Sequence, residues 1–216
     1  MEVLKALLEA KEYHMAVGIT GQYKPTLVEA AVKEAIYTAY DNASNGNRTR
    51  GGMKKAYDIL QTFQPHFPDS VSFKQIQALI SATHAFSFYS LTLQHGVPFQ
   101  PVSIRIHPDP LSLIEKVLEQ NPKGYTKLDD LLSIGRNLVA AGFLPILEDS
   151  PAPNDATLIA ERRITSLAIS SALASDDFGT AYSYIFTRLA PPTLTTTTST
   201  GTSTTKDDIS WRAVYT

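Results

Sequence analysis

The sequence contains no cysteine. This absence excludes a disulfide framework, a thiolate nucleophile and every sulfur-ligated metal site. The sequence also lacks a Gly-x-Ser-x-Gly elbow and a His-Glu-x-x-His pair, and its glycines do not have the spacing of a phosphate-binding loop. We therefore expect no metal and no cofactor, and no motif identifies catalytic residues.

The positive and negative charges of the chain nearly balance. Lysine and arginine number 19 against 21 acidic residues, for a net charge of −2, so no general field favours nucleic acid. No formal charge occurs between Lys74 and Arg105, but glutamines, histidines and prolines interrupt this stretch. A spanning helix needs about 20 mostly apolar residues. We therefore predict a buried helix there and no transmembrane segment. The start of the chain also lacks the basic and apolar regions of a signal peptide.

The hydrophobic spacing predicts an all-α protein. The expected helices are Val3–Ile19 (in two parts), Thr26–Tyr40, Met53–Phe63, Ser72–Leu93, Asp109 to before Pro122, Thr126–Gly142, Ala156–Ala174 and Asp177–Leu189. Capping-box spacing places three of the helix starts at Thr26, Ser72 and Thr126. Residues 97–107 alternate and contain two prolines, which predicts an extended connection.

Two segments share a pattern of Leu, four residues, an acid, an aromatic, two residues and Ala. The matched pairs are Leu8 and Leu173, Glu12 and Asp177, Tyr13 and Phe178, and Ala16 and Ala181. The pattern suits a helix–turn–helix in which the acid caps the second helix, the aromatic packs into the crook and alanine permits close approach. Such pairs stack in α-solenoids. A chance match between two amphipathic helices is the alternative.

Composition divides the chain into three parts. Residues 1–190 are expected to form a helical, solenoid-like stack of antiparallel helix pairs. Residues 191–208 are rich in threonine and serine, which predicts a flexible linker. Residues 209–216 are apolar again and hold the only tryptophan, so they either dock back on the core or begin a further helix.

Polar candidates for chemistry are few. His84 and His95 lie in or beside the uncharged helix, and a small helical enzyme using them is one hypothesis, although such a histidine is more often a hydrogen-bonded core residue. A basic cluster of Arg48, Arg50, Lys54 and Lys55 either takes an anion or forms a solvated loop rim.

Four aromatic residues follow in the uncharged stretch, namely Phe86, Phe88, Tyr89 and Phe99. They either line a groove for a partner helix or pack in the core, and the core is the more common role. No pattern identifies partner-binding residues.

Five segments carry a resemblance to a known family. They are 40–56, 81–91, 109–118, 125–132 and 176–189. In these segments the chain resembles fungal members of the family of secretory pathway protein thirty-nine, whose animal relative is the neuroblastoma-amplified sequence protein. The resemblance covers roughly residues 3 to 190, and the threonine-rich tract departs from it.

This resemblance implies an α-solenoid subunit of a multisubunit tether on the cytoplasmic face of the endoplasmic reticulum. Such a subunit is a non-catalytic scaffold that binds other tether subunits and SNARE proteins in Golgi-to-ER retrograde transport. It is held peripherally at the membrane through its partners. The family offers no short motif that assigns site residues here. A generic helical peptide-binding module is the alternative that the residues leave open, beside the enzyme hypothesis.

Overall fold

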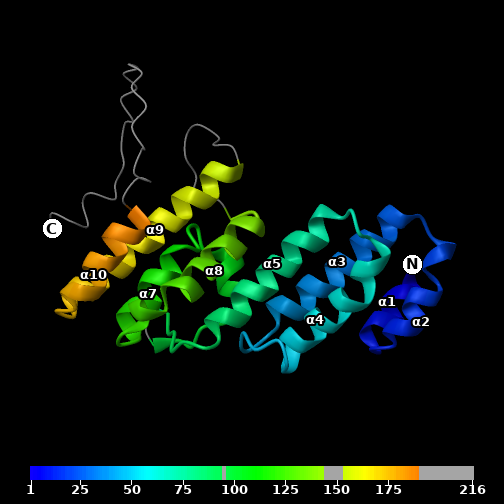
Figure 1. Ribbon diagram of the computed structural model, residues 1–216. Coiled ribbons are helices and arrows are strands. Elements are labelled where there is room, and N and C mark those ends of the chain that lie inside the picture. The colour runs from blue at the N-terminus through cyan, green and yellow to red at the C-terminus, as the bar shows by residue number, and fades with distance from the viewer. Residues whose placement is uncertain (94–95, 144–152, 190–216) are drawn as a thin grey trace, which may run out of the picture. The chain divides into compact units, whose positions relative to one another are not determined.

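The computed structural model describes residues 1–93, 96–143 and 153–189 (Figure 1). Regular structure in these ranges is helical, apart from an isolated β-bridge between Thr92 and Pro98. The α-helices are α1 Glu2–Glu9, α2 Tyr13–Gly18, α3 Pro25–Asp41, α4 Gly51–Phe63, α5 Val71–Phe86, α6 Val102–Ile106, α7 Ser112–Gln120, α8 Leu128–Ala140, α9 Pro153–Ala174 and α10 Phe178–Tyr184. Short 3₁₀ turns η1 Thr20–Gln22, η2 Gln64–His66 and η4 Gly124–Lys127 and a π-type turn η5 Ile185–Leu189 join or extend them. The all-α prediction is confirmed.

The chain folds into two compact units. Unit 1 comprises residues 1–110 and 137–143, and unit 2 comprises residues 111–136 and the residues from 144 onward. The predicted linker 191–208 and the stub 209–216 lie outside the described residues.

Unit 1 is built on helices that each bury one stripe. In α4 the buried side chains recur every three or four residues, which is the period of a helix face. α3 and α4 pack along each other, α1 contacts α3, and α2 and α5 both contact α4. The larger core side chains are Leu4, Leu8, Val28, Val32, Ile36, Tyr40, Met53, Ile59, Leu60, Phe63, Phe73, Ile76, Ile80, Phe86, Ile104 and Leu138.

The predicted capping boxes at Thr26, Ser72 and Thr126 are wrong. Helix α3 begins at Pro25, whose fixed φ suits a first helical position, and Thr26 lies inside it. Helix α5 is capped by Ser70, whose Oγ accepts from the Phe73 backbone N–H at 3.1 Å. Thr126 lies within η4, and its Oγ1 donates to the Lys123 carbonyl.

The extended connection predicted for residues 97–107 is wrong for five of its eleven residues. Residues 102–106 form α6, which Pro101 precedes with helical φ and ψ of −50° and −43°. The alternation of Val102, Ile104 and Ile106 was misleading, because Ile104 is fully buried and Ile106 is 74% exposed. A strand face would bury both.

Unit 2 is built around α9. In this helix Ala156, Ala160, Ile164, Ala168 and Ala172 recur every four residues and are buried. α7, η4, α10 and η5 pack against α9. The four alanines of this row are small enough to let the neighbouring helices approach closely. The larger core side chains of the unit are Leu111, Leu113, Ile114, Val117, Tyr125, Leu128, Leu131, Ile134, Ile164 and Ile169.

The repeated pattern corresponds to a repeated turn. Between α1 and α2, Lys11 has φ +66° and the Glu12 N–H donates to the Leu7 carbonyl at 2.9 Å. Between α9 and α10, Asp176 has φ +57° and the Asp177 N–H donates to the Ala172 carbonyl, also at 2.9 Å. Both are Schellman turns with a left-handed residue after the helix. The match is therefore one of backbone geometry as well as of residue type.

The predicted side-chain roles in this turn hold only in part. Ala16 and Ala181 are both buried, as close helix approach requires. Asp177 caps α10 by accepting from the Thr180 N–H at 3.1 Å, whereas Glu12 makes no side-chain cap for α2. Phe178 is 63% exposed, so the prediction that the aromatic packs into the crook is wrong for the second turn.

Candidate partner-binding surfaces

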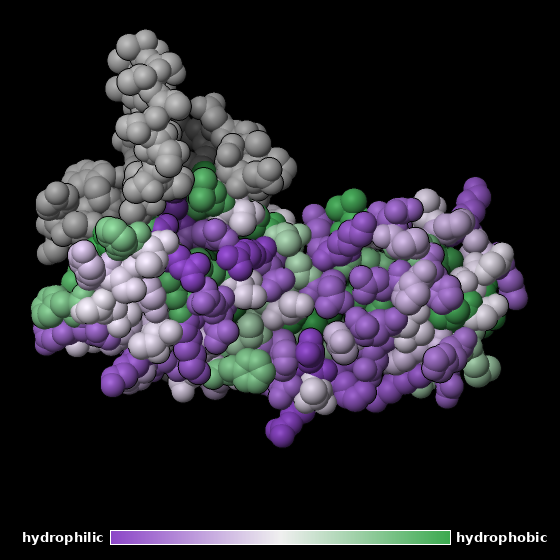
Figure 2. Space-filling view, in the orientation of Figure 1, coloured by the Kyte–Doolittle hydropathy of each residue, from purple (hydrophilic) through white to green (hydrophobic). Residues whose placement is uncertain are grey.

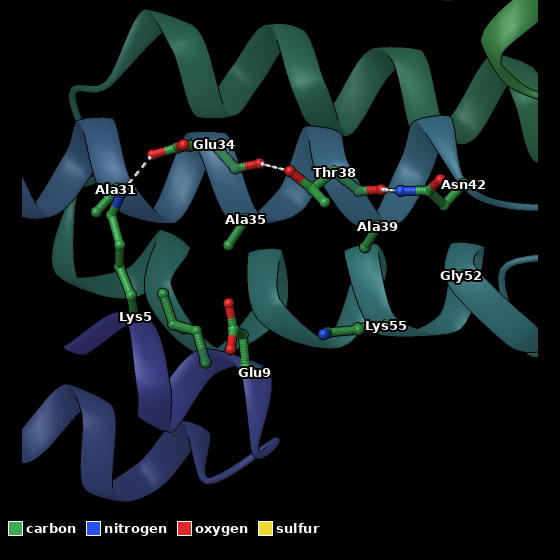
Figure 3. Close-up of a pocket in the computed structure, with 11 residues that line it drawn as sticks. Lys5, Glu9, Ala31, Glu34, Ala35, Thr38, Ala39, Asn42, Gly52 and Lys55 are labelled. Atoms are coloured by element: carbon green, nitrogen blue, oxygen red, sulfur yellow. Dashed lines mark hydrogen bonds and ion pairs between the residues drawn. The ribbon is translucent and has the colours of Figure 1, made fainter. Parts of the chain in front are cut away.

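A groove of about 330 Å³ lies among α1, α3 and α4 in unit 1 (Figure 3). This volume is at the lower end of the range for ligand pockets. The lining residues are Lys5, Leu8, Glu9, Ala31, Glu34, Ala35, Thr38, Ala39, Asn42, Gly52 and Lys55. Its floor is made of small side chains and its rim of charged ones.

Small residues create the floor of this groove. Ala31, Ala35 and Ala39 are spaced by four on α3, so they lie along one helix face. Opposite them, a Cβ added at Gly52 of α4 would lie 2.4 Å from the Ala39 carbonyl oxygen. The two helices therefore approach closely at Gly52. The four-residue spacing of these alanines is the sequence signal for the groove, and no prediction from the sequence used it.

The rim carries both signs of charge. Lys5 Nζ lies 3.1 Å from Glu34 Oε2, with both side chains substantially exposed (Figure 3). Exposed pairs of this kind contribute about 0–1 kcal/mol, so a partner can displace the pair at small cost. Glu9 and Lys55 also line the groove. Mixed charge around an apolar floor suits a peptide segment better than a simple anion.

A buried polar cluster fixes the segment around Pro101 in unit 1. The hydroxyls of Tyr40 and Thr83 lie 2.7 Å apart, and Tyr40 also donates to the Pro101 carbonyl at 3.0 Å. Burial raises the pKa of Tyr40, which keeps the phenol protonated. Nearby, the Arg105 guanidinium lies 4.0 Å above the Tyr37 ring and pairs with Asp41. These contacts join α3, α5 and α6 and make the cluster structural.

The structure places His84 in a packed position. Its Nδ1 accepts a long hydrogen bond from the Arg48 backbone N–H at 3.5 Å, and its ring lies 4.9 Å from that of Phe88. Burial, and secondarily the charge of Arg48, lowers the pKa of the imidazole. The nearby hydroxyls of Ser81 and Ser87 donate to backbone carbonyls. His95 lies outside the described residues.

The basic cluster is divided among separate contacts. Arg48 lies 5.3 Å over the Tyr57 ring, and Lys54 pairs with Asp58 one turn along α4. Lys55 belongs to the groove rim. Three of the four basic side chains thus have contacts of their own with this chain, as the solvated-rim interpretation expects.

The aromatic set is also divided. Phe86 and Phe99 are buried with ring centroids 5.7 Å apart, so core packing is confirmed for these two. Phe88 is 73% exposed. It contacts His84 and otherwise faces solvent.

A second surface in unit 2 is the aromatic face of α10 and η5, formed by Phe178, Tyr182 and Phe186. These side chains recur every four residues and are 63%, 69% and 69% exposed. The rings of Tyr182 and Phe186 are stacked with centroids 6.2 Å apart. Figure 2 shows apolar surface over α10. The opposite side of the helix is anchored, because Ala181 is buried and the Tyr184 hydroxyl donates to the Tyr125 carbonyl at 2.9 Å.

Comparison with known proteins identifies the family. The family model described as secretory pathway protein Sec39 matches residues 1–216. The chain belongs to the Sec39 family. It is also 28% identical over 186 residues to "Protein transport protein sec39" of Schizosaccharomyces pombe. That match covers 86% of this chain and 24% of the relative, so the chain spans about a quarter of the length of this curated Sec39 relative.

Metal-ligand clusters and membrane-spanning helices are both absent from the described ranges of this Sec39-family chain. In residues 1–93, 96–143 and 153–189, no three His, Asp or Glu side chains gather as a metal site would require. No helix in the same ranges has the length and apolar character needed to cross a bilayer. Among the described residues the groove and the aromatic face are the candidate surfaces for a partner, and the family is one of protein transport.

Proposed function

We propose that this chain is a solenoid segment of a non-catalytic scaffold subunit in an endoplasmic-reticulum vesicle tether. It acts in Golgi-to-ER retrograde transport, binds other tether subunits and SNARE proteins, and is held at the cytoplasmic face of the membrane through them. The observation that carries the proposal is the Sec39-family match across all 216 residues. The name of the fission-yeast relative, a protein transport protein, agrees with it.

Two structural features support a scaffold. The Schellman turn recurs with the same hydrogen bonds after α1 and after α9, which is the local geometry that repeated helix pairs need. The groove has an apolar floor and a rim of mixed charge. Its occupant in this proposal is a peptide segment of a partner subunit that places a small apolar side chain over Ala35 between acidic and basic residues.

The test isolates a tagged form of the natural protein that carries this chain from its native cells and identifies what co-purifies by mass spectrometry. We expect endoplasmic-reticulum SNAREs together with one or two large tether subunits. Unrelated partners, or none, would overturn the proposal and favour a generic peptide-binding helical module.

A matched pair of variants tests the groove in the same experiment. Ala35→Trp fills the groove, whereas Ala30→Trp adds the same ring to an exposed position on another face of α3. We expect Ala35→Trp to lose at least one partner that Ala30→Trp retains, with equal helical content by circular dichroism. If both variants keep every partner, the groove is not the binding site, although the tether proposal stands.

A further inference from the structure

The aromatic face of α10 is unusual because its three large rings lie on one side of a helix that is well anchored on its other side. Phe178, Tyr182 and Phe186 are each more than 60% exposed. Single exposed apolar side chains are common, but a contiguous row of aromatic rings marks a surface that another element covers.

The repeated turn indicates what kind of element covers it. In the alignment of the two turns, Phe178 and Tyr182 correspond to Tyr13 and Val17 of α2, and both of these are only partly exposed. The covering element there is α4, which packs along α2. Burial, and secondarily the charge of Asp58 on α4, raises the pKa of Tyr13.

Unit 2 has no such cover in the part that the structure describes. There α10 packs chiefly along α9 and η5. Phe178 and Tyr182 of the aromatic face therefore hold the position at which the first turn has a covering helix and the second has none among the described residues.

We propose that residues 209–215 of this chain cover the aromatic face. This segment, Ile-Ser-Trp-Arg-Ala-Val-Tyr, follows a threonine- and serine-rich stretch and restores apolar composition. Trp211, Val214 and Tyr215 have i, i+3 and i+4 spacing, so one turn of helix presents all three to the same surface. The exposed rings of Tyr182 and Phe186, which are stacked at 18° to each other, give an indole aromatic faces and edges to pack against.

The connection is long enough for this contact. Nineteen residues lie between Leu189 and Ile209, and a random coil of that length has an r.m.s. span of about 25 Å. The path from Phe178 to Leu189 is shorter, at about 17 Å by the helical rise. A tethered segment also has an effective concentration in the millimolar range, which favours docking within one chain over docking between two copies.

The only tryptophan in the chain makes the proposal directly measurable. Emission of Trp211 in the 216-residue chain is recorded with and without acrylamide. We expect blue-shifted emission and weak quenching in the parent chain, and a red shift with stronger quenching in the double variant Tyr182→Ser, Phe186→Ser. The matched control is Leu158→Ser on α9, an exposed apolar residue of the same unit, which should leave the emission unchanged.

A reciprocal measurement guards against a variant that fails to fold. In Trp211→Ser, hydrogen exchange at the α10 amides should become faster, while exchange in α7 stays unchanged. The proposal would be overturned if Trp211 in the parent chain had the red-shifted, strongly quenched emission of an exposed indole. It would also be overturned if the double substitution left the emission of Trp211 unchanged. Blue-shifted emission that vanishes on dilution would assign the contact to a second copy and overturn it equally. Neither result bears on the tether function, because these measurements use the isolated chain.

Discussion

Lys11 and Asp176 occupy the same place in two copies of one turn, each as a left-handed residue directly after a helix, with φ values of +66° and +57°. The residue after each donates its N–H to a carbonyl five positions earlier. Glycine is the usual residue at this position because it has no Cβ. This chain places a charged residue there twice, so both turns carry backbone strain.

Relieving the strain should stabilise the chain. A non-glycine residue in the left-handed region costs roughly 1–2 kcal/mol of strain. Glycine removes this strain, but it costs about 0.5–1 kcal/mol because glycine loses more backbone entropy on folding. We therefore expect Lys11→Gly to raise the free energy of unfolding by up to about 1 kcal/mol. Urea denaturation measures this. Ala6→Gly inside α1 is the control and should lower stability by about 1 kcal/mol; a loss in Lys11→Gly would contradict the strain argument.

Removing the buried phenol of unit 1 should be costly. Tyr40→Phe deletes the hydroxyl that contacts Thr83 and donates to the Pro101 carbonyl. Thr83 keeps its bond to the Leu79 carbonyl, and the Pro101 carbonyl keeps its bond from the Ile104 N–H. The cost is therefore that of two hydrogen bonds at about 0.5–1.5 kcal/mol each, or roughly 1–3 kcal/mol in the free energy of unfolding. The matched control is Tyr182→Phe, whose hydroxyl is on an exposed ring, and its effect should stay within about 0.5 kcal/mol. If chemical denaturation gave the same change in the free energy of unfolding for both variants, the hydrogen bonds of Tyr40 would make no net contribution to stability.

Sequence reasoning predicted the helices well and their exact ends poorly. Amphipathic spacing identified α4 because its buried stripe is long and regular. The cap of α5 was missed by two residues, since both Ser70 and Ser72 precede the apolar run and only the backbone decides which serine accepts from Phe73. Helix α6 was missed because apolar alternation over only five residues is typical of a strand and is equally compatible with a short helix that buries one apolar side chain, here Ile104.

The candidate surfaces were harder to predict for a different reason. A groove arises where side chains are small, so Ala31, Ala35, Ala39 and Gly52 give no chemical signal in a search for charged or aromatic motifs. The four-residue spacing of Phe178, Tyr182 and Phe186 is present in the sequence, but no prediction used it. The exposure of this aromatic face could not be read from the sequence, because the same spacing is typical of a buried helix stripe.

Acid should selectively weaken the cap of α10. The hydrogen bond from the Thr180 backbone N–H is the main cause that lowers the pKa of Asp177 from its ordinary value of 3.8. A carboxylate with a depressed pKa in the folded state stabilises above its unfolded pKa, and the contribution is lost as pH falls through the folded value. Asp177→Asn should therefore be less stable than the parent at pH 7. The difference should shrink below about pH 4.

Glu12 supplies the control for the cap itself. It holds the equivalent position before α2 and makes no side-chain cap, so Glu12→Gln should lower the free energy of unfolding at pH 7 less than Asp177→Asn does. Urea unfolding measures both variants at pH 7 and follows Asp177→Asn down to pH 3. A constant difference for Asp177→Asn across this range would show that the negative charge of Asp177 does not stabilise the cap.

The close approach of α3 and α4 should make Gly52 intolerant of even one methyl group. An alanine Cβ there would lie 2.4 Å from the Ala39 carbonyl oxygen and 3.0 Å from Ala43 Cα, and backbone atoms cannot move aside as a side-chain end can. Overpacking of this kind costs about 1–3 kcal/mol, so Gly52→Ala should lower the free energy of unfolding by that amount. Gly18, which ends α2, is the matched site, because a Cβ added there would meet nothing within 4 Å. Gly18→Ala should be neutral or stabilising by up to about 1 kcal/mol.

Gly52 also lines the groove. In a Gly52→Ala chain that remains folded, α3 and α4 should lie further apart at this point, and the partner of the groove should bind more weakly. Unchanged stability and unchanged binding would show that α3 and α4 can move apart at no cost, which would contradict the close-packing argument.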